Sequence, residues 1–154
     1  MPRRFTVRIF MSLKIHRSAL VMFSCQQMFD LVNDVVAYPQ FLPWCSGAEV
    51  LGCDENVMMA MVQVSKGGVK QSFTTRNQLE AHEKISMSLV DGPFQSLKGD
   101  WCFTALRQDA CKVELELHFE LKPGIGKMAF GAVFNQAANT MVDAFCQRAK
   151  VVYG

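Results

Sequence analysis

Histidine and cysteine are the residues of this chain whose side chains could drive a reaction or hold a metal. The 154-residue sequence contains three histidines, His16, His82 and His118, and six cysteines, at positions 25, 45, 53, 102, 111 and 146. An enzyme needs a nucleophile, a base and an orienting group brought together, or a metal ion. The cysteines form no CxxC pair and show no zinc-site spacing to a histidine. We therefore expect free buried thiols, no metal and no cofactor.

The histidines and carboxylates also lack a catalytic pattern. Strand alternation places His118 beside Glu114 on a solvent-facing side, and His82 falls in an expected turn. Asp34 and Asp143 are single carboxylates, and one carboxylate near a helix end is more often a capping or structural group than a general acid. These patterns predict a protein that acts by binding and not by catalysis.

Lysine and arginine are the second group with chemical consequences, because they bind phosphate. The chain has 16 Lys and Arg against 14 Asp and Glu, and three of the arginines stand in the first ten residues, so the remainder has a net charge of −1. This balance predicts no DNA binding and leaves only a local patch for phosphate contacts. The candidates are Lys66, Lys70 and Arg76, on neighbouring strand or turn segments.

The first ten residues, MPRRFTVRIF, lack the long apolar run and cleavage site of a secretory signal. Because Met11 opens a plausible domain start, we expect residues 1–10 to be a disordered leader or a mis-assigned start, and residues 11–154 to form one domain. The uncharged stretch from Met128 to Val142 has 15 residues, four of them polar, and is too short to span a membrane. We expect a cytoplasmic bacterial protein with at most peripheral contact to the inner membrane.

The pattern of apolar residues predicts an α+β domain. Residues 14–22 read as a strand, and Ser24 with Gln27 has the spacing of a capping box that opens a short helix. From residue 48 to residue 121 turn signals separate strands of similar length, which indicates an antiparallel meander. The segment Val113–Leu121 alternates apolar and polar residues, and residues 126–152 read as one long helix. We expect six to seven strands curled around that helix, with short helices after the first strand.

An aromatic segment from Tyr38 to Cys45 interrupts this order. It holds Tyr38, Phe41, Leu42 and Trp44, and its two prolines exclude a regular helix, so we expect a turn or a fragment of helix that covers something apolar. It would close a cavity between sheet and helix. The expected walls are Met87, Leu89, Trp101 and Phe103 from strands and Phe130, Phe134, Met141 and Phe145 from the long helix. The alternative is that these residues simply fill a packed core.

The same residues carry a family resemblance. The order of elements resembles the START-like or helix-grip superfamily, also labelled polyketide cyclase/dehydrase and lipid transport. More narrowly, the run Tyr38-Pro39-Gln40-Phe41-Leu42-Pro43-Trp44-Cys45 and the later run from Gly92-Pro93-Phe94 through Leu97, Gly99 and Trp101 resemble signatures of the family joining ribosome-association toxins and coenzyme Q-binding START-like proteins. The resemblance covers about residues 11–152.

This resemblance implies two functions of different classes. In the first, the cavity binds ubiquinone or a related polyprenyl lipid and supports respiration or quinone biosynthesis. In the second, the protein binds the large ribosomal subunit, prevents its association with the small one and so inhibits translation initiation. We expect the first, with the second as the alternative.

Overall fold

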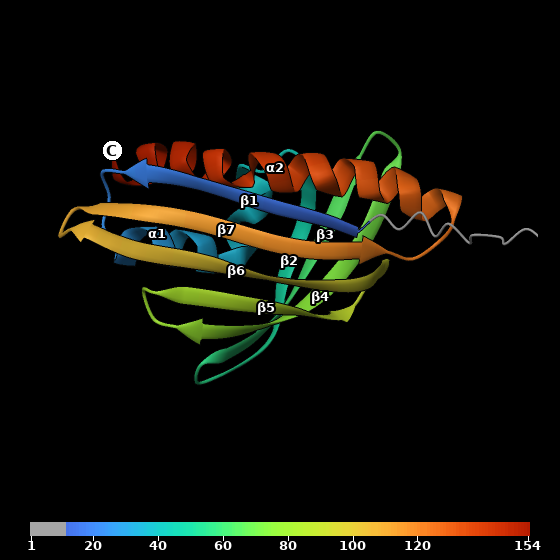
Figure 1. Cartoon of the computed structure of the whole chain (residues 1–154), viewed down its shortest axis with the longest axis horizontal. Helices are drawn as coiled ribbons and strands as arrows, with labels where there is room; N and C mark the ends of the chain where they lie inside the picture. Colours follow the sequence, from blue (N-terminus) through green and yellow to red (C-terminus); the bar gives the residue numbers. More distant parts are fainter. Residues whose placement is uncertain (1–11) are drawn as a thin grey trace, which may run out of the picture.

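The computed structural model describes residues 12–154, apart from the side chains of residues 125–127. The expectation for residues 1–10 lies outside the described part. Seven strands form one antiparallel sheet in the order β1-β7-β6-β5-β4-β3-β2. From β2 to β7, strands that are neighbours in the sheet are also consecutive in sequence, and β1 forms the edge of the sheet next to β7 (Figure 1). The predicted meander is confirmed.

The elements follow the chain in a simple order, and their bounds differ from the predicted ones by a few residues at most where a boundary was predicted. They are β1 (Ser12–Val21), α1 (Cys25–Asn33), the 3-10 helix η1 (Val35–Gln40), β2 (Cys45–Asp54), β3 (Val57–Lys66), β4 (Val69–Glu80), β5 (Lys84–Asp91), β6 (Phe94–Arg107), β7 (Ala110–Leu121) and α2 (Ile125–Tyr153). None of the helices in residues 12–154 combines the length and hydropathy needed to cross a membrane.

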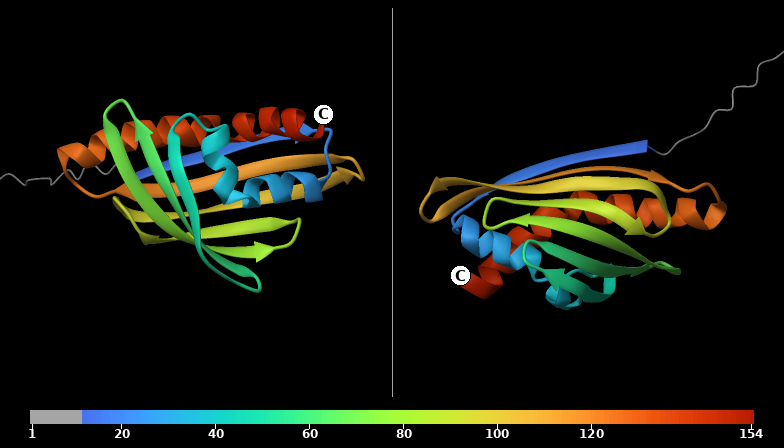
Figure 2. Two further views of the ribbon diagram at one scale, coloured as in Figure 1. Left: turned by 180° about the vertical axis from the view of Figure 1, so that it is seen from behind. Right: turned by 90° about the horizontal axis from the view of Figure 1, so that it is seen from below.

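The sheet curves around α2, and α1 lies on the same concave side (Figure 2). α2 contacts β1, β4, β7 and α1, and η1 contacts β2. This arrangement follows from amphipathic strands: in β7 the residues Val113, Leu115, Leu117 and Phe119 are buried, while the intervening ones face water. The predicted alternation is confirmed.

α1 begins as its sequence predicts. The Ser24 side chain accepts a hydrogen bond from the Gln27 backbone N–H at 3.1 Å, and the Gln27 side chain accepts one from the Ser24 N–H at 2.9 Å. This reciprocal pair satisfies N–H groups that have no partner inside the helix. The buried face of α1 includes Met28, Leu31 and Val32, so the capping box and the apolar periodicity together fix where this helix starts and which side packs inward.

Two glycines of the second sequence signature have a packing reason. Gly92 has a φ of 150°, and a Cβ added there would lie 2.6 Å from the Cβ of Phe73. At Gly99 an added Cβ would lie 2.6 Å from the backbone oxygen of Glu116. Any larger residue would push β4 or β7 away, so these positions maintain the close approach of neighbouring strands.

Candidate functional site

An apolar cavity of about 70 Å³ lies on the concave side of the sheet, under the cover that η1 forms. Its lining comes from η1, the strands and α2: Val35, Tyr38, Trp44, Ala60, Val62, Phe73, Thr75, Asn77, Met87, Leu97, Trp101, Leu115, Leu117, Phe134 and Met141. Ligand pockets usually measure about 300–1,000 Å³. The cavity is therefore smaller than a typical ligand site.

The predicted wall and cover residues divide into two equal groups. Those that line the cavity are Tyr38, Trp44, Met87, Trp101, Phe134 and Met141. Those that lie outside its lining are Phe41, Leu42, Leu89, Phe103, Phe130 and Phe145. Phe130 and Phe145 are 0 % exposed, and their rings pack against other aromatic rings. The packed-core alternative thus describes these two residues better than the cavity does.

The cover is anchored through Tyr38. Its hydroxyl donates a hydrogen bond to the backbone carbonyl of Val32, and its ring meets the ring of Phe145 edge to face at 5.4 Å. Phe41, next to it, lies under the guanidinium of Arg148, 5.0 Å from the ring centroid. The predicted aromatic segment thus begins in η1, which ends at Gln40, and continues as a turn into β2. Tyr38 contacts both α1 and α2.

Burial raises the pKa of Tyr38 well above its ordinary value, and the nearby Cys45 and Asp34 raise it further. The folded protein thus holds this proton more tightly than the unfolded chain, so the stability that Tyr38 contributes is present below pH ~10 and decreases as the pH rises above it.

We expect Tyr38→Phe to lower the free energy of unfolding by about 1 kcal/mol at pH 7, because the Val32 carbonyl loses its partner. Between pH 10 and 11 the wild type should lose up to ~1.4 kcal/mol more than the variant, because only the wild type has this titrating hydroxyl. Urea unfolding of both proteins from pH 7 to pH 11 measures the difference. A constant gap over that range would contradict the assignment.

A buried polar pair in the cavity wall was not among the predicted site residues. Thr75 and Asn77 are 7 % and 6 % exposed, and the Thr75 hydroxyl donates to the Asn77 Oδ1 at 2.8 Å. Among the side-chain hydrogen bonds of the described residues, none uses the Asn77 Nδ2. The sequence did contain a signal, because Thr75 and Asn77 share the inward side of β4 with Phe73 and Leu79.

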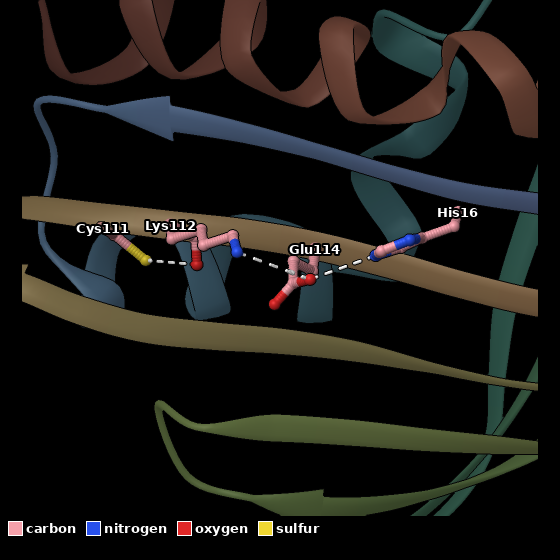
Figure 3. Close-up of polar contacts among 4 residues, drawn as sticks. All are labelled: His16, Cys111, Lys112 and Glu114. Atoms are coloured by element: carbon pink, nitrogen blue, oxygen red, sulfur yellow. Dashed lines mark hydrogen bonds and ion pairs between the residues drawn. The ribbon is translucent and has the colours of Figure 1, made fainter.

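The outer face of the sheet is polar and carries paired charges near β1. His16 Nε2 lies 3.1 Å from Glu114 Oε2, and Lys112 Nζ lies 3.8 Å from the same oxygen (Figure 3). His16 and Lys112 therefore share Glu114 as their acidic partner on this face.

A second group of basic side chains on this face is arranged differently. Arg76 pairs in register with Ser88, Ser88 with Lys98, Lys98 with His118, and His118 with Lys14, across five neighbouring strands. At about 4.8 Å per strand the row spans roughly 19 Å. Lys14, Lys98 and Arg76 are exposed, and none of the ion pairs in residues 12–154 involves them. We call Lys14, Lys98 and Arg76 the basic row.

Two surface grooves meet at the basic row. They measure about 520 Å³ and 570 Å³, and the linings of both include Ser88, Lys98 and His118. Glu116 and Asp100, which pair with each other, occupy the next register position along β7 and β6. Glu120 lines the other groove, so the basic row has carboxylates close by on both sides.

The predicted basic residues do not form one patch. Lys66 and Lys70 flank the β3–β4 turn, but strand alternation puts Lys66 on the inward side, with the buried Val62 and Val64, and Lys70 on the outer side. Arg76 is on the same side of β4 as Lys70, about 20 Å further along. The structure thus groups Arg76 with the basic row and separates it from Lys66.

In the part of the chain that the structure describes, no three His, Cys, Asp or Glu side chains come close enough to hold a metal ion. His16 and His82 each lie near one carboxylate, at 3.1 Å and 4.0 Å, and all of these groups are at least partly exposed. A surface pair of this kind lacks the buried, orienting surroundings of a catalytic base.

Comparison with known proteins gives matches over most of the chain. Residues 21–146 match the family model described as "Polyketide cyclase / dehydrase and lipid transport". A ribosome association toxin RatA of Vibrio cholerae is 55 % identical over 141 residues, which are 92 % of this chain and 98 % of that protein. A mitochondrial coenzyme Q-binding protein COQ10 homolog B of Xenopus laevis is 29 % identical over 89 % of this chain and 58 % of its own length.

A solved structure confirms the fold. The Zhui aromatase/cyclase of Streptomyces sp. R1128 superposes with a TM-score of 0.78 at 15 % identity, over 90 % of this chain and 94 % of that chain. The helix-grip architecture that the resemblance implied is therefore correct. The toxin relative is thus more similar to this chain than the coenzyme Q-binding relative is.

Proposed function

This chain belongs to the polyketide cyclase / dehydrase and lipid transport family, and we propose that it acts by binding the large ribosomal subunit and preventing its association with the small subunit. Such an action would inhibit translation initiation and places the protein in the bacterial cytoplasm. It requires binding alone, so no catalytic residue is assigned.

The observation that carries this proposal is the 55 % identity to a ribosome association toxin across nearly the full length of both proteins. The function preferred from the sequence, quinone binding, has the weaker support, because the coenzyme Q-binding relative is 29 % identical and the chain covers 58 % of it.

The basic row is the surface that we propose for the ribosome contact. Ribosomal RNA presents phosphate groups, and lysine and arginine are the side chains that neutralise them. Lys14, Lys98 and Arg76 are exposed and lie on one line, with grooves beside it. His16 and Lys112, in contrast, already have Glu114 as a partner. The basic row can therefore bind an external anion without breaking an ion pair among the described residues, whereas His16 and Lys112 would have to leave Glu114.

Sedimentation of purified subunits tests the proposal. We expect the wild-type protein to migrate with the large subunit and to reduce the fraction of joined ribosomes when both subunits are mixed at low magnesium. Binding should weaken steeply as salt rises, because released counterions drive phosphate contacts. If the protein neither migrates with the large subunit nor changes subunit joining at low salt, the proposal is wrong.

A second candidate function rests on the Thr75–Asn77 pair. We propose that the cavity binds the carbonyl-bearing head of an apolar lipid such as ubiquinone, with the Asn77 amide donating to the carbonyl oxygen. A buried polar pair in an otherwise apolar wall orients a ligand in this way. Since the cavity measures about 70 Å³, it would have to widen to hold such a ligand, and we expect a movement of η1 away from α2 to widen it.

Tryptophan fluorescence tests the second candidate, because Trp44 and Trp101 line the cavity. We expect a short-tailed ubiquinone analogue to quench their emission saturably, and Asn77→Leu to weaken the binding at least about tenfold by removing the donor. Gln78→Leu is the matched control, because Gln78 is the neighbouring residue on the exposed side of β4. Equal quenching of the two variants, or quenching without saturation, would contradict the proposed site.

A further inference from the structure

Two of the six cysteines lie in direct contact although 86 residues separate them in the sequence. The Sγ atoms of Cys25 and Cys111 are 3.0 Å apart. Cys25 is the first residue of α1 and is partly exposed, whereas Cys111 lies in β7 and is 0 % exposed. Both are free thiols. Figure 3 shows Cys111 on β7, where its Sγ is also 3.5 Å from the Lys112 carbonyl oxygen.

The backbone holds this contact in place from both sides. Cys111 pairs in register with Val21, the last residue of β1, and only residues 22–24 separate β1 from Cys25. The capping box of Ser24 and Gln27 then fixes the first turn of α1. The two sulfur atoms need to approach by about 1 Å to reach the bond length of a disulfide, about 2.05 Å.

We propose that Cys25 and Cys111 are a redox modification site at which hydrogen peroxide forms an intramolecular disulfide. The Cys25 sulfur attacks the peroxide oxygen, which gives a sulfenic acid and releases the first water. The Cys111 sulfur then attacks the Cys25 sulfur, the S–S bond forms, and the hydroxyl leaves with the Cys111 proton as the second water. Two thiols and one hydrogen peroxide thus become one disulfide and two waters.

The surroundings of the two thiols assign their roles. Burial raises the pKa of Cys111 to about 12, and its hydrogen bond with Cys25 adds to the shift. Cys111 therefore stays protonated and reacts second. It attacks the oxidised Cys25 sulfur, with which its own sulfur is already in contact. Cys25 is accessible from solvent and meets the oxidant first. Cys53 is exposed but belongs to β2, on the opposite edge of the sheet from β1.

The bond would join the start of α1 to the sheet. α1 continues through Asp34 into η1, which covers the cavity. A disulfide across 86 residues restricts the unfolded chain strongly, so we expect the oxidised protein to melt roughly 10 °C higher than the reduced protein. Amide exchange in α1 should slow, because the helix can no longer open independently of β7.

Peptide mapping of the full chain after treatment with hydrogen peroxide tests the inference. We expect the mass of the monomer to fall by two hydrogens and a bridged peptide that contains Cys25 and Cys111 to appear. Dithiothreitol should reverse both changes fully. Cys53→Ser should behave as the wild type, and Cys25→Ser should lose both the bridge and the rise in melting temperature. A bridge between Cys111 and Cys146, or oxidation of Cys25 without any bridge, would overturn the proposal, and wild-type mapping decides this even if Cys25→Ser does not fold.

Discussion

Replacing Lys98 and Arg76 together by glutamate is expected to weaken binding to the large ribosomal subunit at least about tenfold near 0.1 M salt. Both side chains are exposed, and neither takes part in the ion pairs of the described residues. The substitution therefore turns the basic row acidic without removing an internal interaction. Folding stability should change by no more than about 0.5 kcal/mol for each residue.

The salt dependence distinguishes a phosphate contact from a general loss of affinity. A protein that gives up two phosphate contacts should show a log–log salt slope that is shallower by about 1.4–1.8. Binding by the variant should approach that of the wild type as salt rises, because the lost contribution is electrostatic. Sedimentation of protein with isolated large subunits at several salt concentrations measures both quantities.

Lys66→Glu with Lys150→Glu is the matched control, because it changes the net charge equally at two exposed lysines away from the basic row. We expect it to retain most of the binding. If the control weakens binding as much as the row variant, the row is not the contact surface. If the wild type itself fails to bind, the proposed function fails and the row remains untested by this experiment.

The basic row shows why the site was harder to predict than the fold. Lys14, Arg76, Lys98 and His118 are far apart in sequence, and their alignment depends on the register between β1, β7, β6, β5 and β4. Alternation within one strand predicts which side of the sheet a residue faces, but it contains no information on register between strands. The contact between Cys25 and Cys111 was unpredictable because it depends on how the start of α1 packs against β7.

The elements themselves were predictable because their causes are local. The capping box at Ser24, the alternation from Val113 to Leu121 and the prolines at positions 39 and 43 act within a few residues. The cavity was predicted in outline but not in its lining. Phe130 and Phe145 belong to the same helical stripe as Phe134, and only the tertiary packing decides which ring lines a cavity and which fills the core.

Phe134→Ala is expected to produce the largest loss of stability, about 3–5 kcal/mol in the free energy of unfolding. Phe134 is 3 % exposed, and its ring centroid lies 4.8 Å from that of Phe119 and 4.9 Å from that of Phe94, both edge to face. The rings of Phe73 and Phe130 contact it as well. Truncation removes this whole set of aromatic contacts between α2 and the sheet. A charged residue at position 134 would unfold the protein and is unsuitable as a test of ligand binding.

Phe41→Ala is the matched control, because it removes the same ring from the partly exposed cover. Its loss should be less than half as large, since less apolar area leaves the protein interior. Urea unfolding at pH 7 measures both variants, and equal losses would contradict the central role of Phe134. Because Phe134 also lines the cavity, its truncation enlarges the cavity, and small apolar molecules should stabilise Phe134→Ala more than the wild type. If they do not, the neighbouring rings have collapsed into the space, and the loss of stability should then fall at the lower end of the expected range.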